Sequence, residues 1–297
     1  MKIIVAGASG FLGTALRRQL ESAGHETVQL VRTPTPGPGQ VRWDPARGEL
    51  DPATLDSADA VVNLGGAPIA RWPWTSTYKQ TILKSRLDTT GTIARTIAGL
   101  DSPPALINAG GINYYGDRGD ELLDEDAGPG NGFIAEVSRQ WDEAPQVAAD
   151  AGARVVRVRT SVVLHKTGGS LKPILIPFRL GAGGKLGDGR QFFPTISLTD
   201  YVAAVSRLIA DPTLAGPFNL VAPAVATNAE FTEALGRALH RPTVIRAPRF
   251  AIKAVAGGEL STLALGSVNA VPRRLMDAGF EFQHPTISAQ LDAALRD

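Results

Sequence analysis

The chain of 297 residues is long enough to bury a large core, and its 30 basic and 29 acidic side chains are spread without long runs of one sign. This balance leaves no extended field for nucleic acid or an anionic membrane surface, so we expect neither as a partner. The absence of cysteine excludes disulfides and thiolate chemistry, and no apolar run approaches the roughly 20 residues of a membrane span, so we expect a cytoplasmic protein.

Short apolar runs typical of buried strands alternate with helical patterns through the first two thirds of the chain. The runs occupy residues 2–7, 27–32, 60–66, 105–111 and 154–164. After the first run, Leu12, Leu16 and Leu20 recur four residues apart before Gly24, which predicts an amphipathic helix that ends there. Strands separated by helices imply parallel pairing with right-handed crossovers. The sequence therefore predicts an α/β fold with a doubly wound parallel sheet of the Rossmann type.

Three glycines lie between the first strand and the first helix, in the spacing G-x-x-G-x-x-G. Glycine there allows a tight turn, close approach of the backbone to a pyrophosphate and close packing of the helix on the strand. The alternative is an ordinary strand-to-helix turn. The position of the motif, directly after the first strand, favours dinucleotide binding, and we predict cofactor contacts for Gly7, Ser9, Gly10, Phe11, Leu12 and Gly13.

The residue that closes the second strand predicts which dinucleotide binds. An acid there suits the ribose 2′-hydroxyl of NAD, whereas arginine suits the 2′-phosphate of NADP. Arg32 occupies this position and no acid does, which indicates NADP(H) unless Arg32 is simply a solvated strand end. The third strand ends in "NLGG", where Asn63, Gly65 and Gly66 can let the backbone pass under the adenosine, and we predict cofactor contacts for Asn63, Leu64 and Gly65. Plain packing is the alternative for these residues.

A change in composition near residue 166 separates two parts of the chain. The stretch over residues 165–193 is rich in glycine and basic side chains, and later segments predict small helices around short strands. We expect an NADP-binding Rossmann domain over residues 1–165, rejoined by part of residues 195–225. A smaller C-terminal α/β domain over residues 166–297 is expected to face a small-molecule substrate of unspecified identity, and no oligomeric state is predicted.

Nine segments carry motifs of a known family. They are "GASGFLG" at 7–13, "DAVVNLGGAPI" at 59–69, "KSRLDTT" at 84–90, "YYGDRGDE" at 114–121, "FIAEVSRQWDEA" at 133–144, "RTSVVL" at 159–164, "PFRLGAGGKLGDGRQFFPTISLTD" at 177–200, "NAEF" at 228–231 and "LMDAGFEFQHPT" at 275–286. The chain thus resembles an extended short-chain dehydrogenase/reductase, in the atypical branch called the epimerase family, over nearly its whole length. The resemblance implies NADP binding and a C-terminal domain of unassigned role.

The same resemblance implies two further cofactor residues. Arg86 would lie near the cofactor phosphates, where a planar guanidinium can fork onto phosphate oxygens. Arg159 ends a strand on the same expected edge of the sheet. The alternatives are a helix-surface role for Arg86 and a surface charge at a strand end for Arg159.

Ordinary members of the superfamily hold a serine, a tyrosine and a lysine around the nicotinamide, and the tyrosine moves a proton. The matching positions here are Gly110 or Gly111, Phe133 and Val137, so all three groups are absent. Phe133 and Val137 belong with Trp141 to an apolar helical stripe, which is most simply a core face.

Two tyrosines are the candidates for the missing proton donor. We expect Tyr115, or else Tyr114, to act as the catalytic residue, with ring packing as the alternative. No metal site is predicted, because no acid–histidine spacing suggests one. The sequence thus predicts an atypical NADP(H)-dependent oxidoreductase or epimerase that lacks the usual serine, tyrosine and lysine. The alternative is a regulator or sensor that binds NADPH without turnover.

Overall fold

The computed structural model describes residues 1–69, 71 and 73–296, and it consists of two compact units. The first unit contains Met1–Gly110, Val137–Val158 and Val202–Pro217. The second contains Gly111–Glu136, Arg159–Tyr201 and the chain from Phe218 onward. The two units interleave along the sequence, and the functional boundary near residue 165 stays a prediction.

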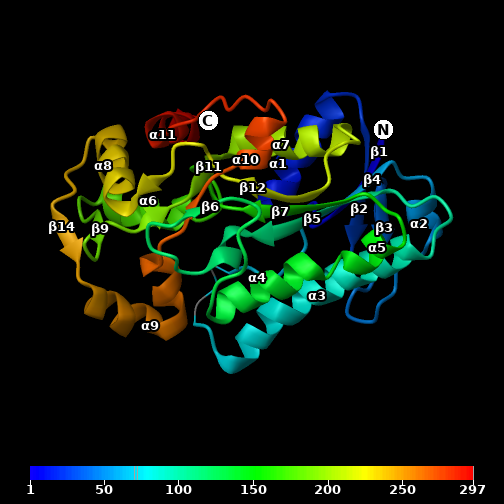
Figure 1. The fold of residues 1–297 in the computed structure, drawn as a ribbon, viewed down its shortest axis with the longest axis horizontal. Helices are drawn as coiled ribbons and strands as arrows, with labels where there is room; N and C mark the ends of the chain where they lie inside the picture. The colour runs from blue at the N-terminus through cyan, green and yellow to red at the C-terminus, as the bar shows by residue number, and fades with distance from the viewer. Residues whose placement is uncertain (70, 72, 297) are drawn as a thin grey trace. The chain divides into compact units, whose positions relative to one another are not determined.

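The first unit is built around a seven-stranded parallel sheet with the strand order β12-β7-β5-β4-β1-β2-β3 (Figure 1). The strands are β1 (Lys2–Ala6), β2 (Glu26–Val31), β3 (Gln40–Arg42), β4 (Ala60–Asn63), β5 (Ala105–Gly111), β7 (Val155–Thr160) and β12 (Gly216–Leu220). Strand β1 pairs in parallel with both β2 and β4, as Ile4 does with Val28 and Val61. The chain leaves β1 in one direction and later returns to its other side, which confirms the doubly wound Rossmann-type fold.

Helices cover both faces of this sheet. They are α1 (Phe11–Ser22), α2 (Ala53–Asp56), α3 (Ser76–Ala98), α4 (Phe133–Glu143), α5 (Gln146–Asp150) and α7 (Leu198–Ala210). Figure 1 shows α1 and α7 on one face and α3 and α5 on the other. Leu16 and Leu20 of α1 are buried, and the predicted stop at Gly24 has a left-handed φ of 83°. On the α3 face, Ile93 and Ile97 pack in one core with Leu106 of β5.

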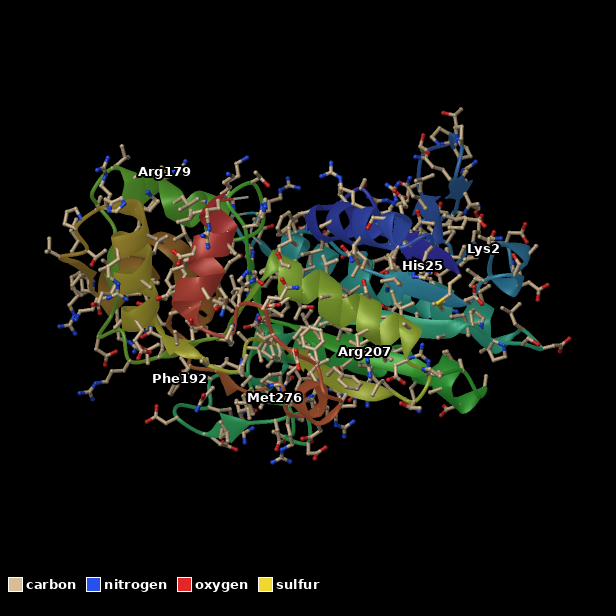
Figure 2. The ribbon with its side chains drawn as sticks, turned by 90° about the horizontal axis from the view of Figure 1, so that it is seen from above. Lys2, His25, Arg179, Phe192, Arg207 and Met276 are labelled. Carbon is tan, nitrogen blue, oxygen red and sulfur yellow. The ribbon has the colours of Figure 1, made fainter. Side chains whose placement is uncertain are left out.

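The second unit is built of short strand pairs and helices. They are η1 (Ile112–Tyr115), β6 (Leu122–Leu123), β8 (Val162–Leu164), α6 (Leu171–Arg179), β9 (Gly184–Leu186), β10 (Phe192–Phe193), β11 (Thr195–Ser197), β13 (Ala226–Thr227), α8 (Asn228–Leu239), β14 (Ile245–Ala247), α9 (Arg249–Leu265), β15 (Asn269–Ala270), α10 (Arg273–Asp277) and α11 (Ile287–Arg296). Helix α9 is kinked at Gly257, where φ is 75°. Figure 2 labels Phe192, whose N–H donates to Ser267 Oγ at 3.0 Å.

Strand pairing joins distant parts of the chain within this unit. Strand β6 pairs with β15, β8 with β11, β9 with β14, and β10 with β13. Helices α6, α8 and α11 share an apolar core that includes Leu175, Leu235 and Leu291. Across the described part of the chain, none of the helices combines the length and the apolar character that crossing a membrane requires.

Candidate functional site

Two of the three glycines in the first turn are required by the protein's own packing. Gly7 has φ 76°, and a Cβ added there would lie 2.8 Å from the carbonyl carbon of Leu64. A Cβ on Gly13 would lie 2.8 Å from the Cα of Ala8, because α1 packs closely on the end of β1. These two glycines therefore shape the turn and fix the helix against its strand.

Gly10 differs from the other two glycines. A Cβ added there would meet a single atom within 4 Å, the carbonyl oxygen of Gly7 at 3.2 Å. Gly10 is exposed and caps the N-terminus of α1, whose first turn carries no acidic side chain. The open space beside this glycine fits a ligand that approaches the backbone, and the N-terminus of α1 suits an anionic group such as a pyrophosphate. Ser9 is exposed, and Phe11 and Leu12 are half-buried.

Arg32 follows β2 at the edge of the sheet where the parallel strands end. Its side chain is exposed and has no hydrogen bond or ion pair to any residue that the structure describes. Arg42, also exposed, ends the neighbouring strand and pairs in register with Val31. The sequence interpretation missed Arg42, because β3 is only three residues long. Two arginines near the ends of adjacent strands suit a phosphate group.

Asn63 holds the end of β4 in place and does not present its side chain to a ligand. It is fully buried, and its Nδ2 donates to Thr90 Oγ1 at 3.0 Å and to Asn108 Oδ1 at 2.8 Å. Its Oδ1 accepts the N–H of Gly65 at 3.1 Å. If Asn63, Leu64 and Gly65 contact a cofactor, they therefore do so through their backbone atoms, which this network holds in position.

Arg86 lies inside the protein, which excludes the helix-surface alternative. Its side chain is 5 % exposed, and Nη1 donates to the carbonyl oxygens of Ala67 at 3.2 Å and Ile82 at 2.9 Å. The guanidinium lies 4.7 Å from the centre of the Trp141 ring. Burial lowers the Arg86 pKa to about 10.

Some donors of this buried cation have no partner within the described part of the protein. Among the described residues, Arg86 has no carboxylate partner, and its Nε and Nη2 make no hydrogen bond. A buried charge normally has a partner of opposite charge. The donor set of Arg86 therefore fits an anionic group, as the resemblance to the family implied.

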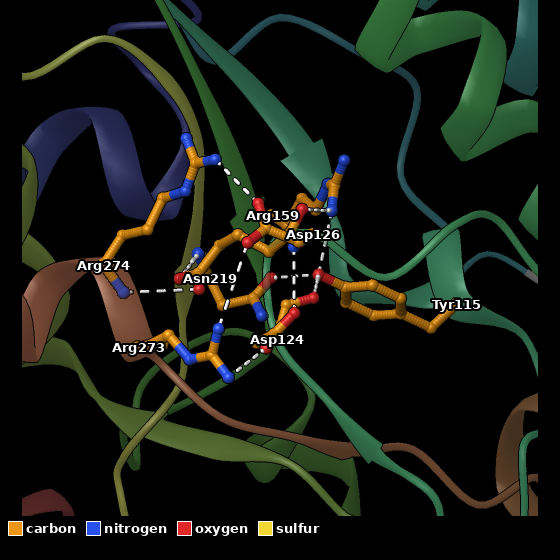
Figure 3. Close-up of polar contacts among 8 residues, drawn as sticks. Tyr115, Asp124, Asp126, Arg159, Asn219, Arg273 and Arg274 are labelled. Carbon is orange, nitrogen blue, oxygen red and sulfur yellow. Dashed lines mark hydrogen bonds and ion pairs between the residues drawn. The ribbon is translucent and has the colours of Figure 1, made fainter.

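A second polar centre lies in the second unit around Glu125 (Figure 3). We call it the Glu125 cluster, and it comprises Tyr115, Asp124, Glu125, Asp126, Arg159, Asn219, Arg273 and Arg274. Glu125 is buried, and its carboxylate accepts the N–H of Asn219 at 2.9 Å and of Arg274 at 3.3 Å. Burial raises the Glu125 pKa, and these N–H donors act in the opposite direction.

Two ion pairs are made by the chain neighbours of Glu125. Arg273 contacts Asp124 at 2.7 Å, and Arg274 contacts Asp126 at 2.8 Å. The cluster thus connects the segment after β6 to the start of α10. The members of the Glu125 cluster bond to one another, as is typical of a network that stabilises the fold.

Tyr115 and Arg159 belong to the same network. Tyr115 is 0 % exposed, and its hydroxyl accepts a hydrogen bond from Arg159 Nη1 at 2.8 Å. The hydroxyl can donate its one proton to either of two acceptors, the carbonyl oxygen of Asp124 or Oδ1 of Asn219, each at 2.8 Å. Burial raises the Tyr115 pKa to about 12. These surroundings favour packing and hydrogen bonding over proton transfer, and the catalytic role of Tyr115 stays a prediction.

Arg159 is 3 % exposed, so it is not a surface charge at a strand end. Its guanidinium lies 3.7 Å from the centre of the Tyr114 ring and 5.2 Å from that of Tyr115. Tyr114 is half-buried, which leaves it the more accessible of the two tyrosines. The roles predicted for Tyr114 in catalysis and for Arg159 in cofactor binding remain predictions.

We expect Tyr115→Phe to lower the free energy of unfolding by about 1–3 kcal/mol, because Arg159 and Asn219 would lose a buried hydrogen-bond partner. NADPH affinity should stay within about twofold if the hydroxyl is structural. Urea denaturation and a fluorescence titration measure the two quantities. A folded variant of unchanged stability that had lost turnover would instead identify Tyr115 as the catalytic residue.

The apolar stripe on α4 is only partly a core face. Val137 and Trp141 are buried, whereas Phe133 is half-buried and lines a small cavity in the second unit. Trp141 also donates its indole N–H to Thr90 Oγ1 at 3.1 Å. A side chain at Gly110 would place its Cβ 3.2 Å from the carbonyl oxygen of Val158. The described residues include no group of three or more His, Asp or Glu arranged to hold a metal ion.

Comparison with known proteins agrees with this arrangement. Residues 3–220 match the NAD dependent epimerase/dehydratase family, and residues 247–297 match a domain of unknown function, DUF1731. The epimerase family protein Mb2239 of Mycobacterium bovis is 41% identical over 98% of this chain and 97% of its own.

Two solved structures are similar over nearly all of the chain. The human epimerase family protein SDR39U1 (isoform 2), crystallised with NADPH, superimposes with a TM-score of 0.92, 35% identity and 100% coverage of both chains. The nucleoside-diphosphate sugar epimerase of Corynebacterium glutamicum gives a TM-score of 0.80 at 34% identity and covers 99% of this chain and 58% of that one.

Proposed function

Because the chain belongs to the NAD dependent epimerase/dehydratase family, we propose that it binds NADP(H) and acts as an oxidoreductase or epimerase on a small molecule. In this proposal, the turn between β1 and α1 binds the pyrophosphate, Arg32 contacts the 2′-phosphate, and Arg86 contributes positive charge. Bound NADPH would supply the hydride. We also propose a cytoplasmic location, with which the lack of cysteine is compatible.

The observation that carries this proposal is the chemistry of the open edge of the first unit. Gly10 leaves space beside the N-terminus of α1, and Arg32 is exposed without a partner among the described residues. No acid closes β2, so nothing at that position matches the ribose 2′-hydroxyl of NAD. The NADPH in the crystal structure of human SDR39U1 supports the same choice of cofactor.

A second candidate function is a sensor that binds NADPH without turnover. It is favoured by the lack of hydroxyl and amine groups at Gly110, Phe133 and Val137, together with the buried, hydrogen-bonded hydroxyl of Tyr115. The two functions differ in whether a substrate is converted. NADPH absorbance followed over time with a panel of carbonyl compounds should fall for an oxidoreductase, whereas an epimerase returns the hydride and is detected as conversion of one substrate stereoisomer to another. Tight NADPH binding with neither result would favour the sensor.

The space beside Gly10 gives a direct test of cofactor binding. We expect Gly10→Ala to weaken NADPH binding by about fivefold or more, since an added methyl group in a filled site costs about 1–3 kcal/mol. The melting temperature should change little, because the methyl group would meet only the Gly7 oxygen. Fluorescence titration and thermal denaturation measure the two effects. Unchanged affinity in the folded variant would contradict a pyrophosphate at this turn.

A further inference from the structure

The second unit contains a small cavity that is lined by residues of η1, α4 and α9 and of the loops next to them. We call it the α4–α9 cavity. Its volume is about 80 Å³, and the residues that matter here are Asn113, Asp117, Asn131, Phe133, Thr262 and Val268. Pockets for drug-sized ligands usually measure about 300–1,000 Å³. The α4–α9 cavity therefore has room for a small molecule or for one end of a larger one.

Two carboxamides give this cavity its polar character. Asn113 is half-buried and Asn131 is exposed, and both line the cavity. Neither side chain makes a hydrogen bond to any residue in the described part of the chain. A carboxamide both donates and accepts hydrogen bonds, so the pair can bind a hydroxyl or a carbonyl group of a ligand.

Apolar groups line much of the remaining wall. Phe133 at the start of α4 and Val268 beside the end of α9 both face the cavity, as does Leu263. A ligand here would exchange water for apolar contacts on one part of its surface. Phe133 occupies the position of the usual tyrosine, and its half-buried ring is explained by its place in this wall.

The charge of the lining disfavours an anionic group inside the cavity. Among the described residues that line the cavity, Asp117 alone is charged, and its Oδ1 accepts the N–H of Ser267 at 3.1 Å. A diphosphate removed from water needs cationic donors, which these lining residues do not supply.

We propose that the α4–α9 cavity binds the substrate, and that this substrate is a small uncharged hydroxy or carbonyl compound with an apolar body, not a nucleoside-diphosphate sugar. The identification of the ligand as the substrate rests on the proposed function. The binding of a ligand in the cavity does not rest on the proposed function, because it requires no cofactor.

Saturation-transfer NMR with named probes tests the binding. Cyclohexanone and cyclohexanol, each at millimolar concentration, should give transfer signals with the full-length protein, and UDP-glucose should give none. Asn113→Ala should weaken the binding of these probes by about two- to tenfold through the loss of one hydrogen bond. Thr262→Phe should abolish it, because residue 262 lines the cavity and is exposed, so a larger side chain can block the space without disturbing the core.

A matched control is available on the same helix. Ala254→Phe adds a phenyl group at an exposed position of α9 that does not line the cavity, and it should leave the signals unchanged. The melting temperatures of all variants should match that of the parent protein. Probe signals that persist in Thr262→Phe, or no signal from either neutral probe, would overturn the inference.

The outcomes separate this inference from the proposed function. NADPH is titrated on the same samples by fluorescence. Neutral probes that bind in the cavity of a protein with no affinity for NADPH would overturn the proposed function, and with it the identification of the ligand as the substrate, but not the binding in the cavity. A protein that binds NADPH, and that binds UDP-glucose in a manner lost with Thr262→Phe, would overturn the choice of substrate class alone.

Discussion

Replacing Arg32 by alanine is expected to weaken NADPH binding by about tenfold to a hundredfold and to leave NADH binding almost unchanged. A hydrogen bond to a charged group contributes about 1.5–3 kcal/mol, and only NADPH has the 2′-phosphate that would accept it. Because Arg32 is exposed at the end of β2, its removal creates no cavity and should not affect stability. Fluorescence titration with the two cofactors at one salt concentration measures the difference.

Arg18→Ala is the matched control for this experiment. Arg18 is an exposed arginine on α1, so its replacement removes the same charge from the same unit but not from the strand edge. It should change the affinity for NADPH and NADH by the same small factor. An Arg32→Ala variant that lost both cofactors equally would contradict the 2′-phosphate contact. Arg42→Ala then tests whether the second arginine at this edge shares the phosphate.

Introducing the usual tyrosine and lysine is not expected to create ordinary dehydrogenase activity. In the double variant Phe133→Tyr/Val137→Lys, the lysine would replace a side chain that is 3 % exposed. A lone buried cation costs several kcal/mol or loses its proton, so we expect the free energy of unfolding to fall by about 3 kcal/mol or more. No hydroxyl would stand at Gly110, and NADPH oxidation with carbonyl compounds should not increase.

The two single variants show which substitution causes the expected loss of stability. Phe133→Tyr adds a hydroxyl to a half-buried ring and should be nearly neutral in thermal denaturation, whereas Val137→Lys should account for most of the loss. Val137→Met is the control for side-chain length without charge. Robust turnover by a stable double variant would mean that the protein lacks only these two groups to be an ordinary dehydrogenase.

Regular features of the fold were predictable because their causes are local. The glycine spacing and the recurrence of Leu12, Leu16 and Leu20 are properties of neighbouring residues, and the structure has β1, the turn and α1 where they were predicted. Strand β3 was missed because three residues carry too little periodicity to recognise. Arg42 was missed with it.

The environments of the candidate residues were not predictable, since they depend on contacts between distant parts of the chain. Arg86 is buried against Trp141, which lies 55 residues further along the sequence. The Tyr115 hydroxyl is bonded to Asn219, 104 residues away. A motif can identify such residues as candidates, but it does not indicate whether their side chains face a ligand or the interior.

The position of the last partners of Glu125 has a consequence for the order of folding during synthesis. Its carboxylate accepts a hydrogen bond from the N–H of Arg274, which is synthesised 149 residues later. Strand β6 likewise cannot pair until β15 has been synthesised. The first unit has its last segment by Pro217, so its sheet and helices can assemble while the C-terminal region is still being translated. Contacts of such long range also form slowly. Until they do, a nascent chain carries an unpaired strand and an uncompensated acidic segment, and we expect this interval to be the one in which chaperones and proteases recognise it.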